Sequence, residues 1–127
     1  MVSFEAFRAV DGTPVYLQII NFIKRGAIAG TIRDGDELPS RRVLSALLGI
    51  NPNTVQKAFH MLEEEHLMES RTGTKSCMTL PPDILDALRR EVLSDELRTM
   101  ARTLRQLGIS KKEALRLIEQ AWEEEAQ

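Results

Sequence analysis

The chain has 127 residues, a net charge of -2, 43% hydrophobic and 28% charged residues. This length suits one domain with a short appendage and excludes a large two-domain protein, while the composition argues against disorder. Aromatic residues make up only 5% of the chain, which favours helices packed on helices over a sheet sandwich. The mild negative charge argues against a protein that coats nucleic acid without selectivity.

Several function classes find no support in the sequence. The N-terminus has no basic region before a long apolar run, and no stretch reaches the roughly 20 apolar residues of a membrane helix. Cys77 is the single cysteine, and His60 and His66 would not share a helix face. No phosphate loop, serine nucleophile motif or carboxylate pair occurs. We therefore expect a cytoplasmic protein with no membrane partner, metal, cofactor or catalytic residue, and not an enzyme.

The first helix is expected between Thr13 and Gly30. Thr13 can cap it, Pro14 suits its first turn, and Gly30 can end it. Its apolar residues share one face: Tyr16, Ile19, Ile20, Ile23 and Ala27. A turn is predicted at residues 33–36, followed by a short extended piece at residues 37–39, because a residue before proline avoids the helical region.

Two further helices are separated by only a short turn. Ser40 can cap the first of them, and Gly49 can adopt the left-handed conformation that ends it. Asn51 can cap the second, with Pro52 at its first position. The expected apolar residues are Leu44, Leu47 and Leu48 in the first helix and Val55, Ala58, Phe59 and Leu62 in the second. This pattern predicts a helix-turn-helix.

The second of these helices has a polar face that carries Asn53, Gln56, Lys57 and His60. Asparagine and glutamine can bond adenine at two points, and lysine reaches guanine or phosphate. No acidic residue occurs in residues 38–62 or 70–82, so a positive face can form on an acidic protein. The alternative is an ordinary solvated face, and we favour DNA reading.

A hairpin is predicted after this helix. Residues 67–71 and 76–80 are strand candidates around a turn that contains Gly73. Arg71 and Lys75 flank that glycine, and a basic hairpin tip can enter the minor groove or rest on phosphates. The alternative is a plain solvated turn. A helix-turn-helix followed by a hairpin predicts a winged helix over residues 1–80.

The remaining residues, 81–127, are predicted to form a two-helix dimerisation module. Pro81-Pro82 is expected to be a stiff linker. A heptad-like seam follows, consisting of Leu93, Leu97, Met100, Leu104 and Leu107, and Leu85, Leu88 and Val92 precede it on a related stripe. Gly108 can end this helix, and Ser110 with Glu113 matches a capping box.

The last helix has its own apolar face, made of Ala114, Leu115, Ile118, Ala121 and Trp122. Two helices cannot enclose a core, so these stripes should pack against the winged helix, a second copy, or both. We favour a homodimer.

Four blocks of this sequence resemble the GntR family of bacterial winged-helix regulators, and the shortness of the tail resembles its YtrA subfamily. The blocks are Pro14-Val15-Tyr16-Leu17-Gln18-Ile19, Gly35-Asp36-Glu37-Leu38-Pro39-Ser40-Arg41-Arg42, Asn51-Pro52-Asn53-Thr54-Val55-Gln56-Lys57-Ala58 and Arg71-Thr72-Gly73. Together they cover about residues 12–80. The chain departs at Val43, where many members have glutamate, and at Lys75, where the wing often has a second glycine.

The resemblance implies roles for particular residues. Arg42 matches the arginine of the family's Leu-Pro-Ser-x-Arg motif, which implies DNA contact, whereas Arg41 occupies a variable position. For Arg41, an ion pair with Asp34, Asp36 or Glu37 and a DNA contact have equal weight. The expected DNA-binding set is Arg41, Arg42, Asn51, Asn53, Thr54, Gln56, Lys57, Arg71, Gly73 and Lys75.

The resemblance also implies a homodimer on a pseudo-palindromic, double-stranded DNA operator. Such a protein usually represses transcription until an effector, here unidentified, releases it, and YtrA-type regulators often control transporter genes. The residues themselves leave one alternative open, a winged helix that binds another protein.

Overall fold

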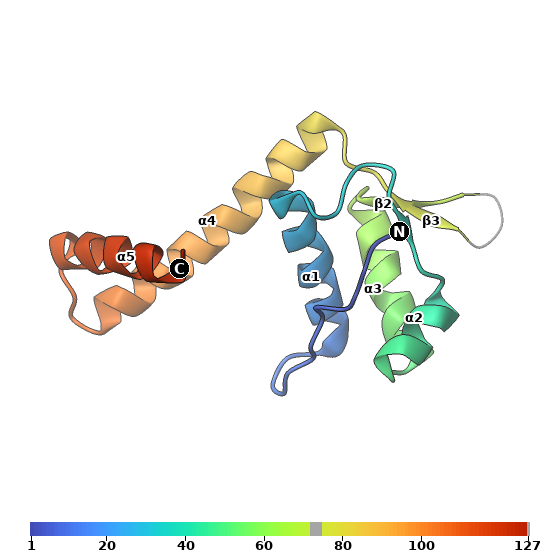
Figure 1. The fold of residues 1–127 in the computed structure, drawn as a ribbon, viewed down its shortest axis with the longest axis horizontal. Coiled ribbons are helices and arrows are strands. Elements are labelled where there is room, and N and C mark those ends of the chain that lie inside the picture. The colour runs from blue at the N-terminus through green and yellow to red at the C-terminus, as the bar shows by residue number, and fades with distance from the viewer. Residues whose placement is uncertain (72–74, 127) are drawn as a thin grey trace. The chain divides into compact units, whose positions relative to one another are not determined.

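The computed structural model describes residues 1–71 and 75–126. The described part forms two compact units, Met1–Arg89 and the residues from Arg90 onward, and each is considered on its own. The helices are α1 (Val15–Ala29), α2 (Arg41–Leu48), α3 (Pro52–Glu64), α4 (Pro82–Gln106) and α5 (Lys111–Glu125) (Figure 1). The strands are β1 (Glu37–Leu38), β2 (Met68–Ser70) and β3 (Ser76–Met78).

The predicted ends of the helix-turn-helix are confirmed. The Ser40 hydroxyl accepts a hydrogen bond from the Val43 backbone nitrogen at 3.1 Å and begins α2. Gly49, with φ 66°, ends that helix in the left-handed region. Asn51 Oδ1 then accepts from the Asn53 nitrogen at 2.8 Å. Two local caps and one glycine therefore set where both helices begin and end.

The predicted cap of α1 is wrong. Pro14 occupies the cap position and no side chain caps the helix, which begins at Val15. The Gln18 side chain instead binds the preceding loop, donating to the Val10 and Thr13 carbonyls at 2.9 and 2.7 Å. Thr13 thus contributes its backbone carbonyl, and not its hydroxyl, to the start of α1.

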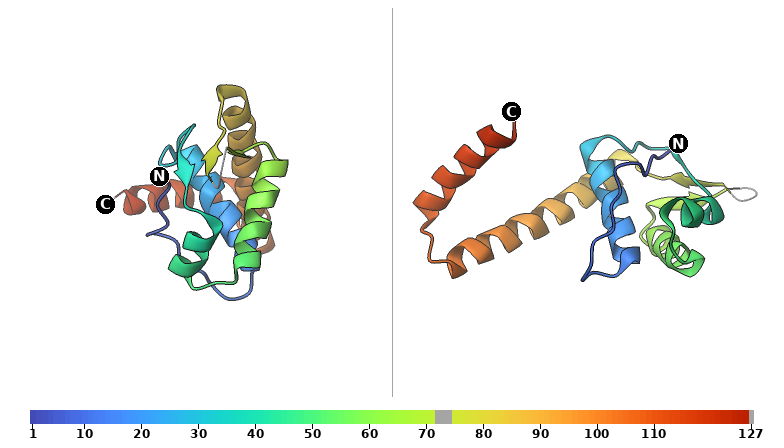
Figure 2. Two further views of the ribbon diagram at one scale, coloured as in Figure 1. Left: turned by 90° about the vertical axis from the view of Figure 1, so that its right-hand side faces the viewer. Right: turned by 60° about the horizontal axis from the view of Figure 1, so that its bottom comes forward.

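The core of the first unit lies between α1, α2, α3 and the sheet, and Figure 2 shows these helices packed together. Its largest fully buried side chains are Ile19, Ile23, Leu44, Val55, Phe59, Leu62 and Met78. Leu47, which the sequence groups with Leu44 and Leu48 as the apolar residues of α2, is 69% exposed. Eight residues give α2 little more than two turns, and Leu44 takes the fully buried position on this helix.

The N-terminal segment, which sequence reasoning left without a role, completes this core. Val2, Phe4 and Phe7 are buried, and the rings of Phe4 and Phe7 lie 5.2 and 5.5 Å from that of Phe22 in α1. The Val2 nitrogen also donates to the Glu37 carbonyl at 2.7 Å. The segment therefore covers α1 and β1.

The hairpin prediction is confirmed, and the extended piece before Pro39 becomes a third strand. The sheet has the antiparallel order β1-β3-β2, with Cys77 opposite both Glu37 and Glu69. Leu80 donates its backbone nitrogen to Asp34 Oδ1 at 2.7 Å, which ties the chain after β3 to the turn before β1. The strand β3 is therefore held between β1 and β2, and this bond fixes the chain that follows it.

The expectation of a stiff linker at Pro81-Pro82 is wrong, because Pro82 is the first residue of α4. Proline suits a first helical position, where its missing N–H needs no partner. The first turns of α4 belong to the first unit, where Leu88 is only 4% exposed. The compact units therefore divide within α4, at Arg89 and Arg90.

In the second unit, α5 is capped as predicted by Ser110, whose hydroxyl accepts from the Glu113 nitrogen at 3.2 Å. Gly108 has φ 79° in the turn before it. None of the residues described from Arg90 onward is buried. Among the described residues, no helix is both long enough and apolar enough to cross a membrane.

Candidate nucleic-acid interface

The two faces of α3 differ as the sequence predicts. Val55, Ala58, Phe59 and Leu62 are buried. The polar residues Asn53, Gln56, Lys57 and His60 are all exposed, and Thr54 is half-buried. Because the buried face holds α3 in the core, the polar face is presented to solvent on a rigid element, as major-groove reading requires.

Asn51, one of the expected DNA-binding residues, is also the N-cap of α3. Its Oδ1 is occupied by the Asn53 nitrogen, so the side chain is oriented by its own helix. On the other side of the turn, the buried Ser45 hydroxyl donates to the Ile50 carbonyl. These two hydrogen bonds fix the turn between α2 and α3.

Lys57 contacts an aromatic ring from another helix. Its Nζ lies 4.0 Å from the centre of the Tyr16 ring in α1, a cation–π contact. Sequence reasoning placed Tyr16 on the apolar face of α1 and missed this contact, since only the packing of α1 against α3 brings the residues together. His60 also has a neighbour, with its Nε2 2.7 Å from Glu64 Oε1.

Arg41 and Arg42 have different surroundings. Arg42 is exposed and makes no ion pair within the described residues. Arg41 is half-buried, and its Nη2 lies 3.0 Å from Oε1 of Glu63 near the end of α3. Arg41 therefore pairs with Glu63. The partners expected from the sequence were Asp34, Asp36 or Glu37.

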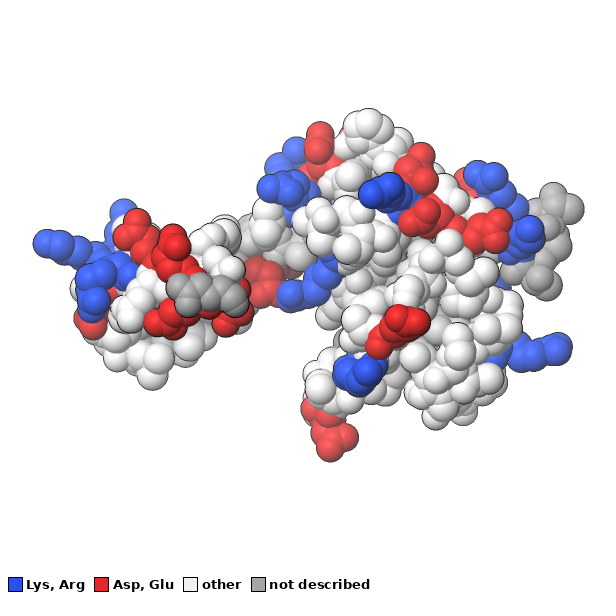
Figure 3. All heavy atoms as spheres, in the orientation of Figure 1, with Lys and Arg blue, Asp and Glu red and all other residues white. Residues whose placement is uncertain are grey.

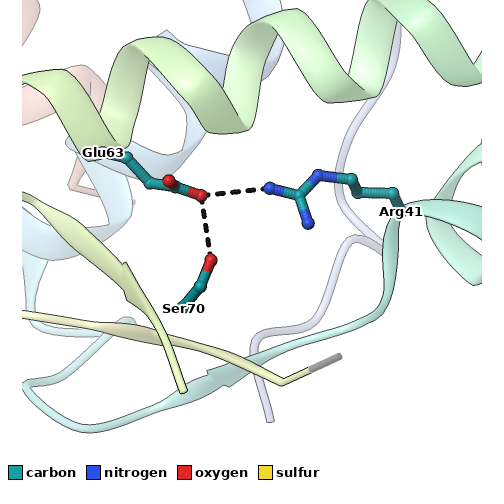
Figure 4. A network of polar contacts seen from close by, with 3 residues as sticks. All are labelled: Arg41, Glu63 and Ser70. Atoms are coloured by element: carbon teal, nitrogen blue, oxygen red, sulfur yellow. Dashed lines mark hydrogen bonds and ion pairs between the residues drawn. The ribbon is translucent and has the colours of Figure 1, made fainter. Parts of the chain in front are cut away.

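Glu63 was not singled out in the sequence. Its Oε1 also accepts a hydrogen bond from the Ser70 hydroxyl at 3.1 Å, so one oxygen joins α2, α3 and β2 (Figure 4). The sequence indicated only that a glutamate lies at the end of the third helix, and nothing in it pointed to the partners of this glutamate. Its partners lie 22 residues before and 7 residues after it.

The basic residues of the wing are exposed and have acidic neighbours. Arg71 Nε lies 3.7 Å from Glu69, and Lys75 Nζ lies 3.8 Å from Glu37. Figure 3 shows lysine and arginine side chains beside the wing, with acidic ones next to them. Gly73, expected at the wing tip, lies outside the described residues. The Arg71 nitrogen donates to the Lys75 carbonyl at 2.8 Å across the hairpin.

Comparison with known proteins identifies a family that part of this chain matches. Residues 15–75 match the model of the bacterial regulatory proteins of the gntR family. The chain is 29% identical to the uncharacterized HTH-type transcriptional regulator YhcF of Bacillus subtilis, over 80% of this chain and 84% of that protein. It is 44% identical to the HTH-type transcriptional repressor YtrA of the same species, over 50% of this chain and 48% of the repressor.

Solved structures extend the likeness to the whole fold. A GntR family transcriptional regulator from Listeria monocytogenes matches 88% of this chain and 98% of its own, with TM-score 0.81 and 28% identity. YtrA from Sulfolobus acidocaldarius, a GntR-family transcription factor, matches 94% of this chain and 100% of its own, with TM-score 0.55 and 25% identity. These matches confirm the predicted fold class, a mainly helical winged helix-turn-helix with a small β-hairpin and further helices.

Proposed function

Through residues 15–75 the chain belongs to the gntR family of bacterial DNA-binding transcriptional regulators, and we propose that it is a dimeric repressor of a pseudo-palindromic operator. The observation that carries this proposal is the exposed polar face of α3, which the buried opposite face holds in place. Repression is supported by the name of the YtrA relative, a transcriptional repressor. The protein acts in the cytoplasm, where bacterial DNA lies.

The reading contacts are assigned to α3. Asn53, Gln56 and Lys57 are exposed along one face, and their side chains reach base edges in the major groove. Thr54 and Asn51 contact the DNA backbone at the start of the helix, where free N–H groups also favour phosphate. Each protomer therefore places one recognition helix in one half-site.

The backbone contacts outside α3 come from basic residues on either side of it. Arg42 is exposed at the start of α2 without an ion-pair partner in the described chain, so it is free to meet a phosphate. Arg71 and Lys75 stand at the two sides of the wing, with Gly73 between them in the sequence. Their long ion pairs with acidic neighbours, 3.7 and 3.8 Å, are weak enough at the surface to be exchanged for phosphate.

A second copy covers the apolar seam of α4. Four of the five seam residues are exposed, including Leu97 at 61% and Leu107 at 70%, and Leu104 is half-buried. Monomers rarely expose a contiguous apolar stripe of this kind. The dimer interface consists of Leu93, Leu97, Met100, Leu104 and Leu107. A two-fold dimer presents the same reading face twice, which is what a pseudo-palindrome requires.

Release by an effector is assigned to the dimerisation module, over residues 81–127. The second compact unit, which starts at Arg90 within this module, contains an open apolar pocket of about 550 Å³ whose lining includes Leu97, Leu104 and Ile118. A small molecule bound there would change the spacing of the two reading heads and weaken operator binding. The controlled genes are proposed to include transporter genes.

The experiment that tests the function is fluorescence anisotropy of the purified protein with its own upstream DNA and with a scrambled control, at several salt concentrations. We expect selective binding that weakens steeply with salt and saturates at two protomers per site. Equal, weak binding to both DNAs, followed by a genomic fragment selection that recovers nothing, would contradict the proposal and favour a protein-binding role.

Two variants then test the reading face. Gln56→Ala should cost about 1–3 kcal/mol of operator binding and relax the preference at one base pair. Lys57→Ala should weaken binding and lower the salt dependence. Gln120→Ala, which removes an exposed glutamine from α5, is the matched control and should change neither. If both α3 variants behaved like that control, the face would be misassigned.

A further inference from the structure

We propose that Arg41, Glu63 and Ser70 form a clasp that holds the wing against the helix-turn-helix, and that Arg41 is a positioning residue rather than a DNA contact. This inference rests on the proposed operator binding. The clasp is the set of two polar contacts to Glu63 Oε1, from Arg41 Nη2 at 3.0 Å and from the Ser70 hydroxyl at 3.1 Å (Figure 4).

Arg41 is held in place by more than its ion pair. Its guanidinium carbon lies 5.4 Å from the centre of the Phe59 ring, and that ring is 1% exposed in the core. Its Nε is buried and has no hydrogen-bond partner within the described chain. The guanidinium therefore lies along the body of the protein, with its stem packed rather than extended into solvent.

Moving Arg41 to a phosphate would leave Glu63 without its cation. The side chains of Arg41 and Glu63 are 32% and 30% exposed. Those of the wing residues Arg71 and Lys75 are 62% and 69% exposed. A half-buried carboxylate that loses its partner is costly to leave unpaired. Because Arg42 stands next in the chain, exposed and unpaired among the described residues, it can meet DNA without this cost.

The position of Ser70 explains what the clasp controls. Ser70 is the last residue of β2, directly before Arg71 and the turn of the wing. The strands β2 and β3 have only three residues each, and β2 lies at the edge of the sheet, so few backbone hydrogen bonds hold its end. A bond from Ser70 to Glu63 therefore fixes the end of β2 against α3, and with it the direction in which the wing leaves the body.

The first test compares Arg41→Gln with its neighbour Arg42→Gln as the matched variant. Loss of one phosphate contact lowers the slope of log affinity against log salt by about one. We expect that decrease for Arg42→Gln. Arg41→Gln should weaken operator binding while leaving the slope at the wild-type value. An equal loss of slope in both variants would overturn the positioning role.

The second test needs no DNA. In NMR spectra of the full chain, Arg41→Gln and Glu63→Gln should each shift the backbone amides of residues 68–71 and 75–78, and Arg42→Gln should leave these amides unchanged. Ser70→Ala should in turn shift the amide of Glu63. Wing amides that stay in place in both Arg41→Gln and Glu63→Gln would overturn the proposal. This NMR test shows whether the clasp exists even if the protein does not bind an operator. A failure of the clasp and a failure of the proposed function can therefore be told apart.

Discussion

Two neighbouring arginines show how little residue type alone says about a role. Arg41 packs on Phe59 and pairs with Glu63, whereas Arg42 projects from the same turn of α2 without an ion pair among the described residues. Consecutive helical residues point about 100° apart, so one can face the body while the next faces solvent. The difference between them therefore comes from the orientation of α2 against α3.

Tyr16 and Lys57 form a second pair that joins separate helices, with 4.0 Å between Nζ and the ring centre. We predict a coupling free energy of about 0.5–1 kcal/mol between them, the usual range for exposed cation–π contacts. The measurement is a double-mutant cycle of urea unfolding with Tyr16→Leu and Lys57→Met. Tyr16→Phe is the control and should keep the coupling, because the ring remains. Strictly additive effects in the leucine cycle would rule the contact out.

The helix α2 has only eight residues and no acidic residue in its first turn, so the Ser40 cap is the side-chain support that its N-terminus has. Val43, 49% exposed, donates its backbone nitrogen to Ser40. Glutamate at this position would complete a capping box by reaching back to the Ser40 nitrogen, and its charge would favour the helix N-terminus.

We therefore predict that Val43→Glu raises the free energy of unfolding by about 0.5–1 kcal/mol, measured by urea denaturation. Val43→Gln can form the same hydrogen bond without the charge, so it separates the box from the helix dipole. The gain should persist in a Ser40→Ala background, because the backbone nitrogen of residue 40 and the positive end of the helix dipole both remain there. No gain from either substitution at Val43 would contradict the prediction.

The helix α4 changes its apolar face along its length. Leu88 is buried within the first unit, while Leu97 is 61% exposed. Nine residues at about 100° each place these two leucines on opposite sides of the helix. The same continuous helix therefore serves the winged helix with its first turns and exposes a different stripe further on.

At the level of the assembled protein, that exposed stripe is where the proposed dimer forms. Leu97→Asp should yield monomers in analytical ultracentrifugation and weaken operator binding, because a carboxylate would have to be desolvated in an apolar interface. Thr99→Asp adds the same group on nearly the opposite side of α4 and should leave the dimer intact. Dimers that survived Leu97→Asp would place the interface elsewhere.

The order of the helices and strands could be predicted from the sequence, because the caps, turns and apolar spacing that indicate it are local. Ser40, Gly49 and Asn51 act on backbone groups within a few residues of themselves, and the apolar spacing of α3 needs only one helix to interpret. The same locality explains the error at Pro82, since a proline that cannot continue a strand can still begin a helix, and the residues alone do not distinguish a linker from a helix start.

Contacts between distant segments were decided by the tertiary structure. The partner of Arg41 lies 22 residues away, and acidic neighbours closer in sequence were the natural expectation. Burial of Phe4 and Phe7, exposure of Leu47, and the approach of Lys57 to Tyr16 likewise depend on which surfaces meet. A sequence specifies the periodicity of each element, but the packing of one element against another selects which side chains are covered and which charges become neighbours.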